Sequence, residues 1–321
     1  MTAKDKTGLE IDEHGTTLIV RINGGKHALL SPDTASQLGK LVDRADKDPN
    51  IHAVVFTGAH PDRFLSHADV AWLQEGGVGF PPINTRVAGI VSRMARVINK
   101  LPIVRSLAGM TRLKTLLQLD DLHATLLKMN ASGTIFVAAL NGSALAIGAE
   151  FAWACDLRIM ADGDFVIGLS EVLLALTPGG GGSQRLTRLI GTRQSLAAIL
   201  EGKPFTPAEA LALGAVDEVV SQDKVLERAI ERAEYLSLRS KNSLGAIKRS
   251  VYFGSSMSLS DGLQFEHAEF LVIDQSREAQ QLMLEYIATT EATGELPLLD
   301  RKTYDRALSM GRIGSHSTEL V

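Results

Sequence analysis

Two glutamates stand out because each lies in an apolar part of the sequence. Glu150 is the only charged residue between Ala131 and Cys155, and Glu171 follows Gly168-Leu-Ser. Burial raises the pKa of a carboxyl group toward neutrality, and two such groups that face one cavity can divide the roles of acid and base. An isolated buried glutamate is more often part of a hydrogen-bonded structure, so the spacing by itself leaves both roles open.

Two His-x-Asp pairs offer a second possible site. His60 with Asp62, and His67 with Asp69, bring together residue types that ligate metals. We expect no metal here, because Asp69 suits the N-cap of a helix. A triad of Ser66, His67 and Asp69 is excluded, since near neighbours on one strand cannot form the required relay.

The glycine run from Gly179 to Gly182 could in principle cradle a phosphate group. It lacks the Lys-Ser/Thr pair of a P-loop and the G-x-G-x-x-G spacing of a dinucleotide site. We therefore predict a tight entry into a helix at this point.

Several short motifs keep a fixed order along the chain. The main ones are Asn141-Gly-Ser-Ala-Leu-Ala-Ile-Gly-Ala-Glu150, Cys155-Asp-Leu-Arg158, Gly168-Leu-Ser-Glu171 and Thr177-Pro-Gly-Gly-Gly-Gly-Ser-Gln-Arg-Leu186. Phe64-Leu-Ser-His-Ala-Asp69 precedes them, and Gly202 with Ala208 to Val220 follows them. Together they resemble the crotonase family, the enoyl-CoA hydratases and isomerases, from about Thr16 to Ile287 apart from an insertion.

The resemblance implies a reaction and the residues that carry it. Glu150 and Glu171 match the two family carboxylates, which would orient and activate a water molecule that adds to a trans-2-enoyl-CoA. The backbone N–H groups of Ala68 and Ile147 match the oxyanion hole, and the backbone of Gly179 matches a group that helps hold the water. The alternatives are a double-bond isomerase, another acyl-CoA lyase or hydrolase of the same fold, or a catalytically idle CoA-binding scaffold.

The resemblance also implies how coenzyme A, as part of the substrate, is held. The stretch from Asn23 to Leu29 is similar to the family's K-x-N-A-L loop, which makes Lys26 and Ala28 candidate CoA-binding residues. A lysine at such a position is solvated surface about as often as it is a ligand. No separate cofactor and no metal are expected.

The chain departs from the family pattern at the predicted site. Ala146-Ile147-Gly148 replaces three glycines, which puts a β-branched side chain where the backbone usually needs freedom. His67 replaces the glycine of the first loop, and Ser170 replaces the proline before the second glutamate. In the C-terminal part, Asp274-Gln-Ser-Arg-Glu-Ala279 replaces the family's D-x-x-E-G segment, so adenine contacts are not carried over.

The pattern of apolar residues predicts the elements around these motifs. Strands are expected over 16–22, 52–57, 134–140, 157–160, 164–167 and 215–220. Helices are expected over 32–47, from 69 onward, after 142, after 182, and over 207–214, 224–237, 243–252 and 259–287, followed by a loose tail. The fold class is α/β: a crotonase-like spiral of ββα units over 1–205, then a helical C-terminal region over 206–321. In the family, such helices mediate trimer and hexamer assembly.

A basic helical insertion is predicted at about 76–119. This segment contains no Asp or Glu and seven bases: Arg86, Arg93, Arg96, Lys100, Arg105, Arg112 and Lys114. Apolar residues recur at helical spacing at Val87, Ile90, Val91, Met94, Val97, Ile98 and Leu101. We favour a helix packed on the domain with a solvated basic face over a docking surface for an anionic partner. Arg93, Arg96 and Lys100 are also candidates to contact CoA phosphates.

Charge and composition exclude several classes of protein. The 321 residues carry 33 Lys and Arg against 37 Asp and Glu, a net charge of −4, which supplies no global field for nucleic acid or an anionic membrane. Cys155 is the only cysteine, so no internal disulfide forms, and the start has no apolar signal segment. Asn141-Gly142 divides the apolar stretch into a strand and a helix, which argues against a membrane span. We expect a cytoplasmic enzyme.

Overall fold

A six-stranded sheet forms the centre of the protein. The computed structural model describes residues 7–78, 82–111 and 113–313. The strand order is β1-β2-β3-β5-β7-β9; β1 runs antiparallel to β2, and the other pairs are parallel. The strands are β1 (Gly8–His14), β2 (Thr17–Asn23), β3 (Ala53–Gly58), β5 (Ile135–Leu140), β7 (Leu157–Ala161) and β9 (Glu218–Val220).

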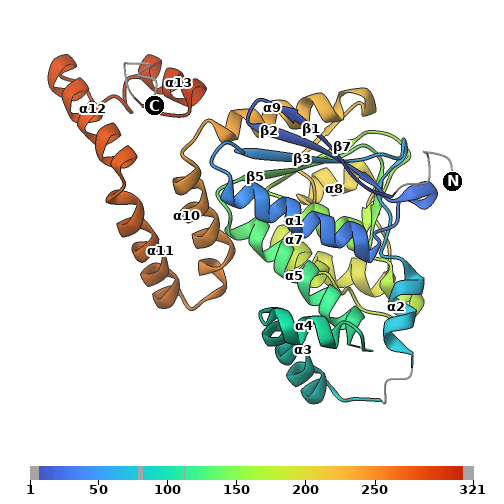
Figure 1. The fold of residues 1–321 in the computed structure, drawn as a ribbon. Helices are drawn as coiled ribbons and strands as arrows, with labels where there is room; N and C mark the ends of the chain where they lie inside the picture. The colour runs from blue at the N-terminus through green and yellow to red at the C-terminus, as the bar shows by residue number, and fades with distance from the viewer. Residues whose placement is uncertain (1–6, 79–81, 112, 314–321) are drawn as a thin grey trace.

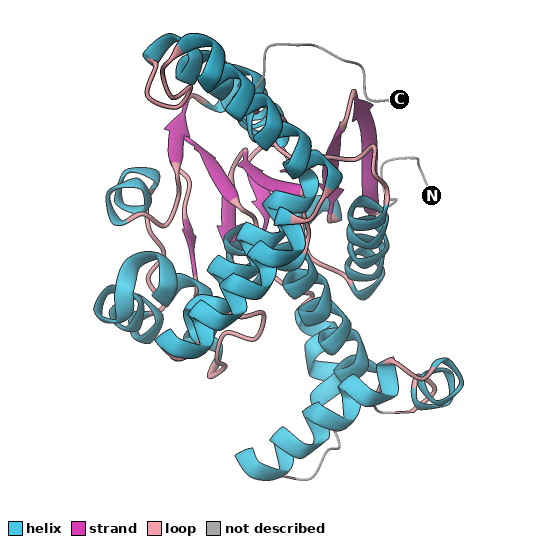
Figure 2. Ribbon diagram, turned by 90° about the vertical axis from the view of Figure 1, so that its left-hand side faces the viewer, coloured by secondary structure: helices cyan, strands magenta, loops and turns pink. Residues whose placement is uncertain are grey.

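Helices cover both faces of this sheet, as Figures 1 and 2 show. In the central strand β3, Val54 and Phe56 face the core shared with α1 and α5, while Ala53 and Val55 face α9. Side chains alternate across a strand, so a strand buried on both faces is apolar throughout. The helices are α1 (Pro32–Lys47), α5 (Lys114–Ala131), α7 (Gly182–Glu201), α8 (Pro207–Leu213) and α9 (Val225–Ser237).

A second, three-stranded parallel sheet positions the candidate site. Its order is β4-β6-β8, with β4 (Arg63–Leu65), β6 (Ser143–Leu145) and β8 (Ile167–Gly168). Parallel strands end at the same edge of a sheet. The loop after Leu65, helix α6 (Ile147–Ala154) and the segment leading to Glu171 therefore start side by side. Cys155 ends α6, and its side chain is fully buried.

Most predicted elements are present, with differences in places where local signals are weak. Helix α1 spans 32–47 as predicted, and the Ser31 side chain caps it by accepting from the Thr34 N–H. The edge strand β1 was not predicted. The predicted helix over 259–287 is wrong as a single element: α11 (Leu259–Asp274) and α12 (Arg277–Thr293) are separate, because the Ser276 side chain caps a new helix.

The ends of the predicted domains also differ in detail. The tail expected to be loose contains α13 (Arg301–Met310), capped by Asp300. The central sheet continues past residue 205, because β9 pairs with β7 and α9 packs on β3 and β5. A boundary at residue 205 therefore separates β9 and α9 from the sheet to which they belong. The division into two domains stays a prediction.

The segment predicted as an insertion forms helices at one end of the molecule (Figure 1). They are α2 (Val70–Gly77), α3 (Thr85–Asn99) and α4 (Pro102–Ala108), after which α5 returns to pack against α1. Arg112 lies outside the described residues. Short 3-10 helices occur at η2 (Gly25–His27), η3 (Glu171–Leu174), η4 (Gln222–Lys224) and η5 (Gly254–Ser256).

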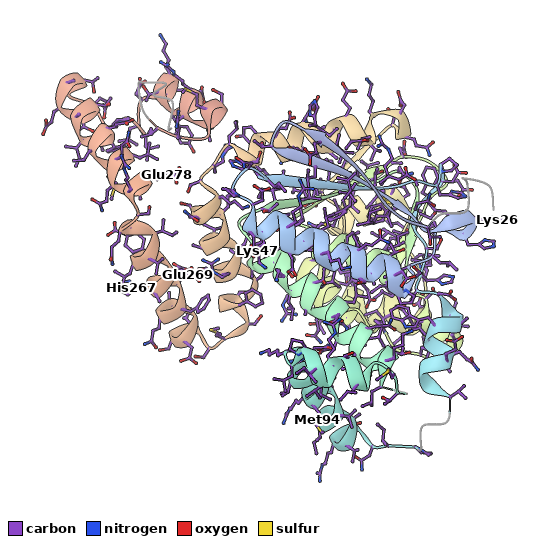
Figure 3. All side chains as sticks on the ribbon, in the orientation of Figure 1. Lys26, Lys47, Met94, His267, Glu269 and Glu278 are labelled. Carbon is purple, nitrogen blue, oxygen red and sulfur yellow. The ribbon has the colours of Figure 1, made fainter. Side chains whose placement is uncertain are left out.

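The C-terminal helices extend away from the sheet as an arm. Helix α10 (Lys241–Tyr252) lies against the core, and α11 and α12 project from it, as His267 and Glu278 mark in Figure 3. Large apolar side chains are exposed along this arm, among them Leu259, Leu263, Phe270, Val272, Leu284 and Ile287. No helix in the described ranges is both long and apolar enough to cross a bilayer.

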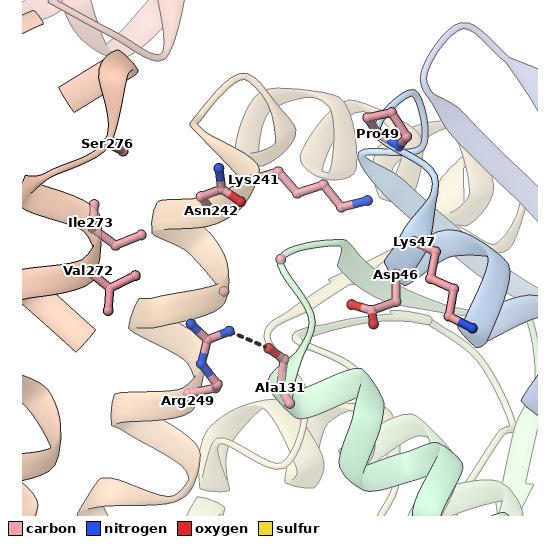
Figure 4. Close-up of a pocket in the computed structure, with 12 residues that line it drawn as sticks. Asp46, Lys47, Pro49, Ala131, Lys241, Asn242, Arg249, Val272, Ile273 and Ser276 are labelled. Carbon is pink, nitrogen blue, oxygen red and sulfur yellow. Dashed lines mark hydrogen bonds between the residues drawn. The ribbon is translucent and has the colours of Figure 1, made fainter. Parts of the chain in front are cut away.

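Polar contacts fix the base of the arm around a pocket between α1, α5, α10 and α11 (Figure 4). Lys241 Nζ donates to the carbonyls of Ala45, Asp48 and Ile51 at 2.7–2.9 Å. Arg249 donates to the Ala131 carbonyl at 3.1 Å. The lysine thus satisfies carbonyls at and beyond the C-terminal end of α1, where a cation is favoured.

Candidate active site

The carboxylate of Glu150 is held by the backbone of the glycine run. Glu150 lies in α6 and is buried, and its Oε1 accepts from the N–H groups of Gly180 at 2.8 Å and Gly182 at 2.7 Å. Its Oε2 also accepts from Gly180 at 2.8 Å. Burial raises the pKa of Glu150, and the two backbone donors oppose that rise.

The glycines are required here because their backbones pass so close to the carboxylate. A Cβ on Gly180 would lie 2.2 Å from Cδ1 of Ile147 and 2.5 Å from Oε2 of Glu150. A Cβ on Gly182 would lie 2.9 Å from Oε1 of Glu150. Helix α7 begins at Gly182, so the predicted tight helix entry is confirmed, and it serves as a cradle for a carboxylate.

Glu171 faces the same region from η3. Its Oε2 is buried, and within the described residues no hydrogen-bond partner contacts that atom. Burial raises the pKa of Glu171 to about 6, and the charge of Glu150 adds to the rise. The two carboxyl groups therefore lie close enough to influence each other's ionisation.

The backbone N–H groups of Ala68 and Ile147 are the predicted oxyanion hole. Leu30 exchanges hydrogen bonds with His67 and Asp69, which leaves the N–H of Ala68, between them, outside the pairing. Ile147 is the first residue of α6. In the described part of the chain, neither the Ala68 N–H nor the Ile147 N–H donates to a protein acceptor.

Close backbone packing brings these two donors to the same edge of the small sheet. A Cβ on Gly148 would lie 1.8 Å from the carbonyl oxygen of Leu65, so only glycine permits α6 to start this near to β4. The Leu145 N–H also donates to the Ser66 carbonyl at 3.1 Å. The structure thus places the loop of Ala68 beside the start of α6, and the role of the two N–H groups as an oxyanion hole stays a prediction.

Ala146 has a strained backbone at the turn into α6. Its φ is 49° and its ψ is −122°, a region that residues with a Cβ rarely adopt. The Ala146 N–H donates to the Gly168 carbonyl at 2.8 Å, which holds this turn against β8. The strain sits directly before the Ile147 N–H, so it is part of the geometry that aims that donor.

His123 contacts the site and was not predicted from the sequence. It lies on α5, and its Nε2 is hydrogen-bonded to the carbonyl oxygen of Gly179. This contact fixes the peptide between Gly179 and Gly180, whose N–H in turn binds Glu150. No motif marks His123, because the contact joins residues that are 56 positions apart in the chain.

The two candidate CoA-binding residues lie in different surroundings. The Ala28 carbonyl accepts from the Ser66 N–H at 2.8 Å, which ties it to the loop of Ala68. Lys26 lies in η2 with its side chain exposed, and Figure 3 shows it at the surface. The CoA-binding role of both residues stays a prediction.

The residues of the possible metal site are engaged separately. The His60 ring accepts from the Asp62 N–H at 3.1 Å, and the Asp69 side chain caps α2 through the Ala71 N–H at 2.9 Å. Among the residues that the structure describes, no three His, Cys, Asp or Glu side chains form a group that could hold a metal ion.

Comparison with known protein families identifies the family of this chain. A model of the enoyl-CoA hydratase/isomerase family matches residues 106–293. The chain belongs to this family. The match includes both glutamates and the glycine cradle, and it agrees with the crotonase-like fold expected from the motifs.

Similar solved structures extend the likeness to nearly the whole chain. An enoyl-CoA hydratase from Geobacillus kaustophilus HTA426 is 25% identical with a TM-score of 0.71, over 89% of this chain and 95% of that one. An enoyl-CoA hydratase from Bacillus anthracis is 24% identical with a TM-score of 0.68, over 90% and 97%. Pseudomonas aeruginosa DspI is 22% identical with a TM-score of 0.69, over 90% and 97%, and shows the same fold.

Proposed function

We propose that this family member adds water to a trans-2-enoyl-CoA thioester. The observation that carries the proposal is the pairing of two unlike carboxyl groups. Both oxygens of Glu150 accept backbone N–H groups, whereas Glu171 presents a buried oxygen that contacts no partner in the described residues. Such a pair suits a reaction that needs one base and one acid.

The thioester carbonyl would lie between the N–H groups of Ala68 and Ile147. Negative charge develops on that oxygen as the enolate forms, so donors aimed at it stabilise the transition state more than the ground state. The N-terminal end of α6 adds its dipole to the Ile147 donor. Positions 68 and 147 act through the backbone, which is why Ala and Ile serve there.

The environments of the two glutamates support a division of their roles. Two N–H donors favour the charged form of Glu150, so it would accept a proton from water as the water oxygen attacks C3. Glu171 is protonated more readily and would deliver a proton to C2, which completes the 3-hydroxyacyl-CoA. Return of the proton from Glu150 to Glu171 restores the starting state.

The test follows the loss of the enoyl absorbance of crotonyl-CoA. Glu150→Gln and Glu171→Gln should each lower kcat by about two to four orders of magnitude, the usual range for lost acid or base assistance. Glu201→Gln, at the exposed end of α7, is the matched control and should act like the wild type.

Two results would contradict the proposal. Near-normal hydration by either glutamine variant would exclude the two-carboxylate mechanism. Conversion of a 3-enoyl-CoA to its 2-enoyl isomer, with no hydration by the wild type, would make the protein an isomerase of the same family.

We also propose that the protein forms a homotrimer or hexamer. The apolar side chains exposed along α11 and α12 support association, because a monomer would leave this surface in water. Sedimentation velocity of the full chain tests the proposal, and a monomer at micromolar concentration would contradict it.

A further inference from the structure

Helix α3 leaves a stripe of large apolar side chains in solvent. The α3 stripe consists of Val87, Ile90, Met94 and Val97, each 41–58% exposed, and Leu101, just past the end of the helix, is also exposed. These positions follow one another every three or four residues, so they lie on one side of the helix. Helix α3 was predicted to pack on the domain with a solvated basic face, and the structure leaves these four apolar positions exposed as well.

The packed side combines half-buried Val91 and Ile98 with smaller and polar residues. Ala95 is buried, and Ala88 and Ser92 are half-buried where α3 lies against α5. Asn99 donates to the Leu117 carbonyl at 3.1 Å and to Asp120 at 3.0 Å. These contacts fix the rotation of α3 about its axis, and the stripe consequently points outward.

A basic edge runs beside the stripe. It consists of Arg86, Arg93 and Lys100, seven residues apart along the helix and hence on one side of it. Across the described ranges, no carboxylate lies within ion-pair distance of these three, whereas Arg96 pairs with Asp120 and Arg105 with Asp121. The edge therefore retains its positive charge at the surface.

The exposed face of α3 contains almost nothing else. From Arg86 to Leu101, every exposed side chain is aliphatic, methionine or a cation, and Gly89 is the only other exposed residue. The face is about 22 Å long at 1.5 Å per residue. It lies at the outer end of the molecule, where Figure 3 marks Met94, and α4 extends the apolar surface with Ile103 and Leu107.

We propose that α3 docks this face on an anionic lipid surface. Helices that lie in a membrane interface typically have an apolar side next to a side that is rich in Lys and Arg and has no acidic residues. The apolar side chains would enter the acyl boundary while the cations meet lipid phosphates. The net charge of −4 does not oppose docking, because salt screens the effect of charges that lie farther than about 10 Å from the lipid surface.

A protein partner fits the same face less well. A protein interface usually forms about one hydrogen bond per 100–200 Å² of contact area. Beyond Thr85 in its first turn, the exposed face of α3 offers cations as donors but no side chain that accepts a hydrogen bond. Lipid headgroups need only donors and charge, so they suit a face of this kind.

The experiment measures sedimentation of the full chain with vesicles. We expect binding to vesicles of phosphatidylcholine mixed with phosphatidylglycerol, weak binding to phosphatidylcholine alone, and weaker binding in high salt. Arg86→Glu, Arg93→Glu and Lys100→Glu combined should weaken binding at least about a hundredfold, since each cation near an anionic surface contributes roughly fivefold. Met94→Ser with Val97→Ser should weaken it about tenfold or more.

A matched triple variant on other helices is the control. Lys40→Glu, Arg193→Glu and Arg277→Glu change the same net charge at exposed positions and should bind vesicles within a fewfold of wild type. Circular dichroism should show that all variants are folded.

Several outcomes would overturn the proposal. Equal binding to neutral and anionic vesicles would exclude an anionic lipid surface, and so would full binding by the α3 triple variant. Absence of vesicle binding, together with self-association that the α3 variants abolish, would assign the face to a second copy. If the wild type does not bind vesicles and the α3 triple variant has a raised KM for acyl-CoA, the basic residues of α3 would be assigned to CoA phosphates.

Discussion

The ionisation of Glu171 should be visible in the kinetics. Its carboxyl group has a pKa raised to about 6, so it holds its proton below that pH and loses it above. If Glu171 supplies the proton to C2, kcat/KM should fall about tenfold per pH unit above about pH 6, and it should also fall at lower pH where Glu150, the proposed base, takes up a proton. A pH series of initial rates measures this, and Glu171→Gln should remove the break. A rise in kcat/KM through the same pH would instead make Glu171 the base.

Substitution of His123 tests whether the glycine run that holds Glu150 needs a contact from α5 to keep its position. We treat it as a positioning residue, because it contacts the Gly179 carbonyl and reaches Glu150 only through the adjoining peptide. His123→Ala should lower kcat by roughly ten- to hundredfold with a smaller change in KM, since small displacements of catalytic groups are costly. His123→Gln keeps a donor and should recover part of the loss. An unchanged kcat in His123→Ala would show that the glycine run holds its shape unaided.

At the scale of single elements, the turn into α6 stores backbone strain. Ala146 holds a φ of 49°, which glycine adopts without a steric penalty. Ala146→Gly should therefore raise the free energy of unfolding by about 1 kcal/mol, because relief of strain exceeds the entropy that glycine costs. Urea unfolding of the variant and the wild type measures the difference. A lower free energy of unfolding in Ala146→Gly would mean that Ala146 causes no backbone strain in this turn.

The same elements show what the sequence could and could not predict. Helix α1 was predicted at both ends, because Ser31 and Pro32 are local signals of a helix start. The break before Ser276 was missed, since the apolar pattern continues across it. The outward stripe of α3 was missed because periodicity identifies an apolar side of a helix but not which side meets the core.

The candidate site shows the same limit. Motif order singled out Glu150, Glu171 and Gly179, and the structure brings these segments together. The contacts of Gly180 and Gly182 with Glu150 join α6 to the start of α7 across 30 and 32 positions. Such contacts depend on where the chain returns in space, so sequence spacing contains no sign of them.

At the scale of the whole molecule, one buried ion pair attaches the C-terminal arm to the sheet. Lys248 on α10 donates to Asp156 Oδ2 at 2.7 Å and to the Thr134 carbonyl at 2.8 Å, and its Nζ lies 5.0 Å from the centre of the Phe136 ring. Its side chain is 8% exposed and that of Asp156 12%.

Removal of the lysine should destabilise the fold. Lys248→Met would leave the Asp156 carboxylate buried without its main partner, which typically costs about 3–5 kcal/mol. Thermal and urea unfolding measure the loss. Lys47→Met, at an exposed position on α1, is the control and should change stability by less than about 0.5 kcal/mol. A small effect at position 248 would mean that water or Tyr252, which donates to Asp156 at 3.3 Å, replaces the lysine.

Labelling of Cys155 can measure how often the protein opens locally. It is the only thiol, it is fully buried where α6 ends, and burial raises its pKa. A thiol reagent can therefore reach it only when the segment around α6 opens, and the labelling rate reports the frequency of that opening. Because Glu150 lies on the same helix, slower labelling in the presence of an acyl-CoA would show how strongly that ligand reduces the opening of the candidate active site, with no engineered probe.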